Sequence, residues 1–210
     1  MARPPFSRDE AKQRLRKAVE AVESRSCAEV VISVRPWSTS WAGIDAAVGA
    51  GLAYLVLLYM LFAEQIFGLL WIALIVPVGF GVGAFTSRSL PGLRMALAGA
   101  RRARAAAEQG ARARFVELGV MGTRERSGVL VYVSLTERQC VVVADVGVLA
   151  RVPEGEWSKA VASVEGSVAS HGVGEPGLSA LCQAVEALGD VLEGPMPRGE
   201  DDVNELEDVA

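Results

Sequence analysis

Two long apolar runs in the first half of the chain limit its fold most strongly. Residues 46–63 and 65–87 contain no charged side chain, and Glu64 is the only charge between them. Each run meets the length of about 20 predominantly apolar residues that a helix needs to cross a bilayer. Two buried core helices are the alternative, but a chain of 210 residues has too little other mass to cover them. The sequence therefore predicts a transmembrane helical hairpin over residues 43–87, with spans at about 44–63 and 66–86 joined by a tight turn.

Charge next to the hairpin predicts its orientation. The turn between the spans carries no basic residue, whereas five arginines follow the second span: Arg88, Arg94, Arg101, Arg102 and Arg104. By the positive-inside rule, both termini and the soluble part of the chain lie in the cytoplasm, with two spans in the cell (inner) membrane. Trp37 and Trp41 stand just before the first span, where aromatic side chains mark a membrane interface.

We expect residues 88–103 to form a basic juxtamembrane helix. Basic side chains beside a span are attracted to anionic lipid headgroups by about 1 kcal/mol each. The segment has no interleaved aromatic side chains on which bases would stack, so nucleic acid is not an expected partner. The expected partner is the lipid bilayer.

Small residues recur at helical spacing in both spans and predict close helix packing. They are Gly43, Ala47 and Gly51 in the first span, and Gly79 and Gly83 in the second. Such a pattern lets helix backbones approach each other, either within one hairpin or between copies in a homo-oligomer. Apart from Asp45 and Glu64 at the edges, the hairpin has no ionisable group, which a transporter would normally need. The spans are therefore expected to act as an anchor.

The remaining residues predict one discontinuous soluble domain, formed by residues 7–36 and 104–194. Helices are expected after Ser7, from Pro91 to about Leu118, and after Pro153 and Pro176, with strands at residues 28–34, 128–135 and 139–146. The last two strands form a hairpin and are apolar at nearly every position, which is typical of strands covered on both faces. If the first strand pairs directly with residues 128–135, the two should be parallel and joined by a right-handed crossover. We therefore expect an α/β fold, a three-layer α/β/α sandwich with a small mixed sheet, followed by an acidic, flexible tail over residues 195–210.

Cysteine and histidine usage excludes two classes of site. Cys27, Cys140 and Cys182 are far apart, and His171 is the only histidine. A zinc site or a disulfide framework is not compatible with these spacings. The thiols are expected to be reduced and to act as small apolar side chains.

Several segments of the soluble part resemble the TPM-domain family. The resemblance is carried by AEVVISVRPW (28–37), GVLVYVSLTER (128–138), VVVADVGV (141–148), Trp157 and DDVNELED (201–208), and by a lead-in made of Ala111, Phe115, Gly119, Thr123, Arg126 and Gly128. It covers roughly residues 7–36 and 104–194. A bacterial membrane branch of the family similarly places its transmembrane segments after the first strand. Members include acid phosphatases, proteins that bind divalent metals such as Ca²⁺, and factors for the repair or assembly of membrane complexes. The resemblance assigns no catalytic residue to this sequence.

Asp145 is the one candidate metal ligand. Mg²⁺ or Ca²⁺ would require clustered oxygen ligands, and Asp145 and Glu137 lie at opposite ends of one predicted strand, roughly 25 Å apart at about 3.3 Å per residue. They cannot share an ion. Asp145 either ends the strand by accepting backbone N–H groups in the turn through Gly147, or contacts an ion or a partner.

Three functions remain open at this point. The first is a membrane-anchored cytoplasmic TPM-like domain that acts as a binding, assembly or quality-control accessory factor for another membrane protein or complex, with no cofactor required. The second is a divalent-metal-assisted, acid-phosphatase-like hydrolase of low activity. The third is a membrane structural protein that forms oligomers through the glycine faces of its spans.

Overall fold

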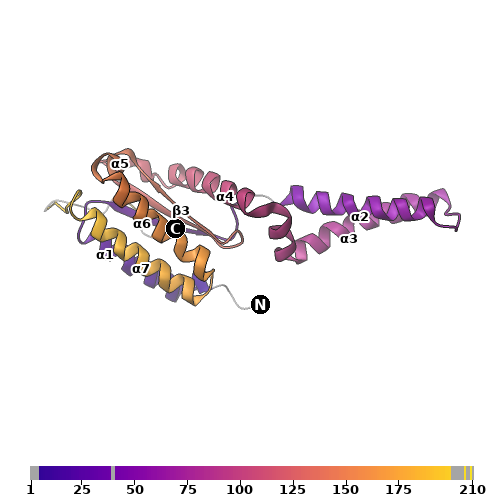
Figure 1. Ribbon diagram of the computed structural model, residues 1–210, viewed down its shortest axis with the longest axis horizontal. Helices are drawn as coiled ribbons and strands as arrows, with labels where there is room; N and C mark the ends of the chain where they lie inside the picture. Colours follow the sequence, from indigo (N-terminus) through magenta and orange to yellow (C-terminus); the bar gives the residue numbers. More distant parts are fainter. Residues whose placement is uncertain (1–4, 39–40, 200–205, 207–208, 210) are drawn as a thin grey trace. The chain divides into compact units, whose positions relative to one another are not determined.

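The computed structural model describes residues 5–38, 41–199, 206 and 209 (Figure 1). The chain divides into two compact units. The sheet unit comprises Met1–Ser38 and Arg104–Ala210, and the hairpin unit comprises Thr39–Ala103. The apolar hairpin is thus inserted into the sheet unit, between its first strand and the helix that follows.

The sheet unit contains a small mixed sheet with the strand order β1-β2-β3. Its strands are β1 (Glu29–Arg35), β2 (Gly128–Ser134) and β3 (Gln139–Ala144). β1 runs parallel to β2, with Glu29 opposite Gly128, and β3 runs antiparallel to β2, with Ala144 opposite Val129. The first strand thus pairs directly with β2 and in the predicted parallel direction, and β2 and β3 form the predicted hairpin.

Helices surround this sheet. They are η1 (Pro5–Ser7), α1 (Asp9–Glu23), η2 (Val120–Gly122), α5 (Val146–Arg151), α6 (Glu154–His171), α7 (Glu175–Leu192) and the part of α4 (Pro91–Glu117) that follows Ala103. The α1 helix buries the face predicted from its apolar spacing: Ala11, Leu15, Ala18, Val19 and Val22. The helix expected after Ser7 has Arg8 as its N-cap, which makes no side-chain capping hydrogen bond. Asp9 and Glu10 instead place negative charge in the first turn, where the helix dipole favours it.

Successive residues of the strands point to opposite faces, and each face packs against helices. One core cluster joins α1, α6 and α7 to residues that include Val30, Ile32, Val129, Val131 and Val133. A second cluster joins Ala107 and Ala111 of α4, and Val120 of η2, to Val31, Leu130, Tyr132 and Val141. Every residue of β2 is buried. The continuous apolar character of β2 thus has a direct cause, because both of its faces are covered.

The hairpin unit contains α2 (Ala42–Phe62) and α3 (Leu69–Ser89). Both helices are long and apolar enough to cross a membrane. At 1.5 Å per residue, each 21-residue helix is about 30 Å long, close to the thickness of a bilayer core. The connection is longer than the tight turn predicted, since the helices are separated by residues 63–68. Gly68 is in an extended conformation before α3, and Phe67 folds back so that its ring centroid lies 6.3 Å from that of Tyr59.

The α4 helix begins at Pro91, as predicted, and is interrupted once. Gly99 has φ 74° and ψ 152°, a conformation outside the helical region. Only glycine adopts this backbone conformation without strain. The predicted basic helix over residues 88–103 therefore consists of the end of α3, the first turns of α4 and a break at Gly99.

The described residues of the C-terminal segment 195–210 contact β1 and the turn that precedes it. Met196 is 1% exposed, and its carbonyl accepts a 3.0 Å hydrogen bond from the Cys27 amide. Pro197 forms an antiparallel bridge with Ser26, and Val209 forms a parallel bridge with Ile32. The predicted flexibility of the tail concerns mainly residues 200–205, 207, 208 and 210, which lie outside the described residues.

Candidate functional site

Glycine residues bring α2 and α3 into close contact. A Cβ atom at Gly83 would lie 2.9 Å from the Gly49 Cα atom and 2.9 Å from the Val48 carbonyl oxygen. A Cβ atom at Gly49 would lie 2.7 Å from the carbonyl oxygen of Phe80. These distances are below those of real Cβ contacts, so the two backbones could not approach this closely with larger residues. Gly79 also lies in this contact, with a Cβ position 3.3 Å from Val56 Cγ2.

The small residues predicted for the first span lie elsewhere. Gly43 and Gly51 have no atom within 4 Å of a Cβ position, and Ala47 is exposed. The packing contact on α2 is made by Gly49, which the spacing argument did not include. Of the five predicted helix-packing residues, the structure therefore brings together Gly79 and Gly83 with α2 and leaves the other three on an outward face.

An ion pair holds the base of the hairpin. The Asp45 carboxylate in the first turn of α2 accepts hydrogen bonds from Arg94, with 2.9 Å between Oδ1 and Nε and 2.5 Å between Oδ2 and an Nη atom. Ser87 of α3 is fully buried and donates to Oδ1 at 2.8 Å. The side chains of Asp45 and Arg94 are only 16% and 15% exposed. These hydrogen bonds join α2, α3 and the start of α4. Arg94 was expected to contact lipid and instead pairs with Asp45.

The remaining predicted anchoring residues differ in exposure. Arg88, Arg101 and Arg102 are exposed. Trp37 is 63% exposed, whereas Trp41 is 9% exposed at the N-cap of α2. Contact of these side chains with lipid stays a prediction.

Arg104 is held within the sheet unit. Its guanidinium donates to the Cys140 carbonyl at 3.1 Å, to Glu165 at 2.8 Å and to Glu108 at 2.9 Å. Partial burial alone would lower the pKa of Arg104, but the hydrogen bonds to the two carboxylates raise it, so the charge is secure. The other oxygen of Glu165 accepts the Val142 amide at 3.1 Å. Together, these two side chains satisfy backbone groups along the outer edge of β3.

Asp145 ends β3 and starts a helix. Its carboxylate accepts the Val146 amide at 2.7 Å and is the N-cap of α5, so the strand predicted to reach residue 146 stops at Ala144. Arg126 Nε donates to Oδ1 at 3.2 Å and lies 3.1 Å from Oδ2. Asp145 is 4% exposed, and its Oδ2 atom has no hydrogen bond within the described part of the chain. The geometry is that of a capping carboxylate with an arginine partner.

Gly147 lets the first turn of α5 lie directly against the loop of Glu125 and Arg126. A Cβ atom there would lie 2.3 Å from the Glu125 carbonyl oxygen and 2.6 Å from that of Arg126. The Gly147 amide also donates to the Arg126 carbonyl at 3.1 Å. The first turn of α5 is thereby fastened to the loop that carries Arg126.

Glu137 and Asp145, the two acidic residues at the ends of β3, have separate partners. Glu137 is fully buried in the β2–β3 turn, where it accepts hydrogen bonds from the Ser38 amide at 3.0 Å and from the Ser134 hydroxyl. It lies beyond one end of β3 and Asp145 lies beyond the other, as predicted. Among residues 5–38, 41–199, 206 and 209, no group of three or more His, Cys, Asp or Glu side chains is placed to hold a metal ion.

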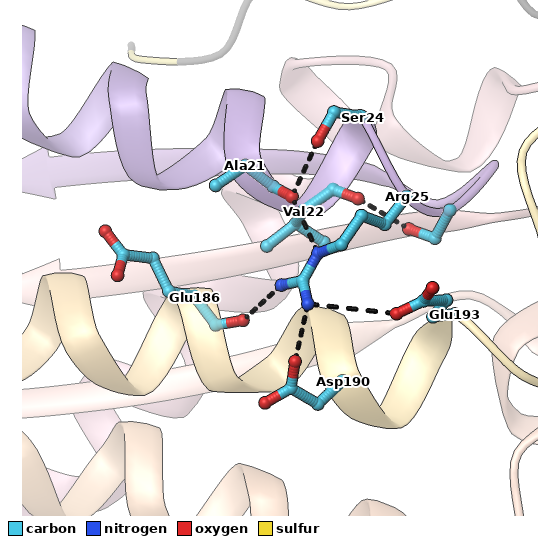
Figure 2. A network of polar contacts seen from close by, with 8 residues as sticks. Ala21, Val22, Ser24, Arg25, Glu186, Asp190 and Glu193 are labelled. Carbon is cyan, nitrogen blue, oxygen red and sulfur yellow. Dashed lines mark hydrogen bonds and ion pairs between the residues drawn. The ribbon is translucent and has the colours of Figure 1, made fainter.

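Arg25 forms a polar network that the sequence did not reveal (Figure 2). It follows the C-terminal end of α1 and donates to the carbonyls of Ala21 at 3.1 Å and Glu186 at 3.0 Å. It also pairs with Asp190 at 2.5 Å and lies 3.8 Å from Glu193. A cation at the C-terminal end of α1 is favourable, because the free carbonyls there carry partial negative charge. Arg25 therefore fixes the α1–β1 turn against α7.

Comparison with known proteins supports the fold only. No protein-family model matches the chain, and no curated protein matches it. The solved NMR structure of the BA42 protein from the psychrophilic bacterium Bizionia argentinensis is similar, with a TM-score of 0.57 and 14% sequence identity. The alignment covers 100% of this chain and 99% of that protein.

Proposed function

We propose that this chain is a membrane-anchored cytoplasmic TPM-like domain that serves as a binding, assembly or quality-control accessory factor for another membrane protein or complex. The observation that carries the proposal is the surface of the hairpin unit. Large apolar side chains are exposed along both of its helices and at its tip, including Leu55 at 61%, Ile66 at 101%, Leu69 at 84% and Phe85 at 72%. Continuous apolar exposure on this scale marks contact with a membrane or with another protein.

Two further features support anchoring rather than transport. Asp45 and Arg94 neutralise each other at the base of the hairpin, and the α2–α3 contact is made by glycines and apolar side chains. Transport pathways normally contain ionisable groups in the spans. For the sheet unit, helices packed on both faces of the sheet support a three-layer α/β/α arrangement. Its cytoplasmic location follows from the arginines after the second span.

Two alternatives have specific support. Homo-oligomerisation would use the outward face of α2, where Gly43, Ala47 and Gly51 are exposed at intervals of one turn. A divalent-metal-assisted phosphatase would use the buried Oδ2 atom of Asp145 with Ca²⁺ or Mg²⁺. Arg126 already lies against that carboxylate, and an ion would need several further oxygen ligands. We therefore place the accessory role first.

The test is photo-cross-linking in native membranes from exposed positions of the sheet unit, such as Lys159 on α6. The proposal predicts a discrete product that joins this chain to a different membrane protein. A product that contains only copies of this chain would support the oligomeric alternative. Phosphomonoester hydrolysis by the purified chain that Ca²⁺ or Mg²⁺ stimulates, and that Asp145→Asn abolishes, would replace the accessory role with the enzymatic one.

A further inference from the structure

Two arginines lie at the end of the sheet from which the chain leaves for the first span. Arg35 ends β1, and Arg138 is in the β2–β3 turn, directly before β3. Ser134 of β2 pairs with both Arg35 and Gln139, so two strand spacings, about 10 Å, separate Arg35 from the neighbour of Arg138. Both arginines are exposed, and neither forms an ion pair within the part of the chain that the structure describes. Two positive charges therefore lie close together at this end of the sheet.

The side chains at this end have the chemistry of a membrane interface. Trp37 follows Arg35 by two residues and is 63% exposed. Tryptophan rings favour the boundary between lipid headgroups and hydrocarbon, and exposed arginines are attracted to anionic headgroups. Arg138 has φ 51°, in the left-handed region that favours glycine. A long basic side chain thus stands at a turn position where glycine would be less strained.

The linker to the first span is fastened to the β2–β3 turn. The Thr136 amide and hydroxyl both donate to the Pro36 carbonyl, at 3.0 Å and 2.6 Å. The Ser38 amide donates to the fully buried Glu137 carboxylate at 3.0 Å. These bonds join the linker to the sheet on both sides of Trp37. The linker therefore has a fixed position on the turn.

The chain connection holds this end of the sheet close to the membrane surface. This step rests on the proposed anchoring by α2, which begins at Ala42, four residues after Ser38. Four residues extend over at most about 14 Å. The headgroup region outside the hydrocarbon core is about 5–8 Å thick on each side of a bilayer. The end of the sheet that carries the two arginines is thus kept next to the headgroups by the length of the chain.

We propose that Arg35, Trp37 and Arg138 form a site for the anionic lipid headgroups of the cytoplasmic leaflet. The ligand is a phosphodiester headgroup with net negative charge, such as that of phosphatidylglycerol. The two guanidinium groups donate charged hydrogen bonds to its phosphate oxygens, and the indole ring lies at the headgroup boundary. Through this site the sheet unit is seated on the membrane surface, beyond the attachment that the spans alone provide.

The test is quenching of Trp37 fluorescence by brominated lipids, in nanodiscs that hold the full chain with Trp37 as its only tryptophan. Phosphatidylglycerol and phosphatidylcholine, each brominated near the top of the acyl chains, are compared at equal fractions in unbrominated phosphatidylcholine. Brominated phosphatidylglycerol should quench Trp37 more strongly, by about threefold or more. The preference should disappear in the double variant Arg35→Gln and Arg138→Gln, and it should weaken at high salt, which screens exposed charges.

The matched control is the double variant Lys17→Gln and Lys159→Gln, which removes the same charge from exposed positions on α1 and α6. It should keep the preference for phosphatidylglycerol at Trp37. A second chain, with Trp71 of α3 as its only tryptophan, reports the anchor, because Trp71 is exposed on the second span. Brominated phosphatidylcholine should quench Trp71 with or without the two arginines.

Equal quenching of Trp37 by the two lipids would refute the headgroup site. Equal loss of the preference in the two double variants would refute it as well, because the effect would then follow net charge and not these arginines. If Trp71 is quenched in either case, the proposed anchoring stands and the site alone fails. Absence of quenching at Trp71 would refute the anchoring and, with it, the site.

Discussion

The contact between Gly49 and Gly83 leads to a quantitative prediction for Gly83→Ala. Alanine is favoured over glycine inside a helix by about 1 kcal/mol. At Gly83 the added methyl group would lie 2.9 Å from backbone atoms of α2, which cannot move as a flexible side chain would. Overpacking of this kind costs about 1–3 kcal/mol. The net effect expected for Gly83→Ala is a loss of up to about 2 kcal/mol in the free energy of hairpin unfolding.

Gly81→Ala is the matched control on the same helix. No atom lies within 4 Å of a Cβ position at Gly81, so only the helix-propensity gain applies. The two variants should therefore differ by the packing cost alone, about 1–3 kcal/mol, with Gly81→Ala the more stable. This difference is robust to the exact propensity scale, because that contribution is common to both variants.

The assay is denaturation with SDS in mixed micelles, followed by energy transfer between fluorophores at the open end of the hairpin. Cysteines introduced at Gly43 and Ser89 would carry the labels, since both positions are exposed. Loss of transfer reports separation of α2 from α3. Equal midpoints for Gly83→Ala and Gly81→Ala would show that the helices do not pack through Gly83, and the reasoning would fail.

Three further predictions concern the sheet unit and α4. Arg104→Met should lower the free energy of unfolding by about 1–2 kcal/mol in chemical denaturation, because the edge of β3 loses a charged hydrogen-bond donor. The control Arg101→Met, at an exposed position, should change it by less than about 0.5 kcal/mol. Burial raises the pKa of the Cys140 thiol and shields it. A maleimide should therefore label Cys27 at pH 7.5 and leave Cys140 unlabelled in the folded chain. Mass spectrometry of the labelled peptides tests this, and labelling of Cys140 before Cys27 would contradict it. Gly99→Ala should lower the thermal midpoint in nanodiscs, since alanine at φ 74° and ψ 152° costs about 1–3 kcal/mol, and an unchanged midpoint would mean that α4 is not broken there.

Periodicity and apolar runs predicted most elements of this fold. The face of α1, the apolar hairpin and the pairing of three strands follow from patterns that burial imposes directly on neighbouring residues. The short helix α5 was missed because six residues are too few to show a helical period. The one sequence feature that indicated the start of α5 was Asp145 before Val146-Gly147, because Asp is a preferred N-cap residue.

The candidate site was predicted less completely, for reasons that lie in the helices themselves. Because α2 is apolar on all sides, its hydrophobic pattern does not indicate which glycine faces α3, and Gly49 was missed while Gly43 and Gly51 were named. Arginine partners depend on contacts distant in sequence. Arg94 meets Asp45 across 49 positions and Arg104 meets Glu165 across 61, and no local pattern reports such pairs.

The central claim is that α2 and α3 anchor a cytoplasmic domain, and labelling of their connecting segment tests it most directly. A cysteine at Glu64, in a chain whose native cysteines are replaced, would be exposed to a membrane-impermeant maleimide on intact cells. The account predicts labelling at this position, whereas a cysteine at Ser158, exposed on α6, should react only after the membrane is permeabilised. Protection of the Glu64 position on intact cells, or equal labelling of both positions, would contradict the proposed topology.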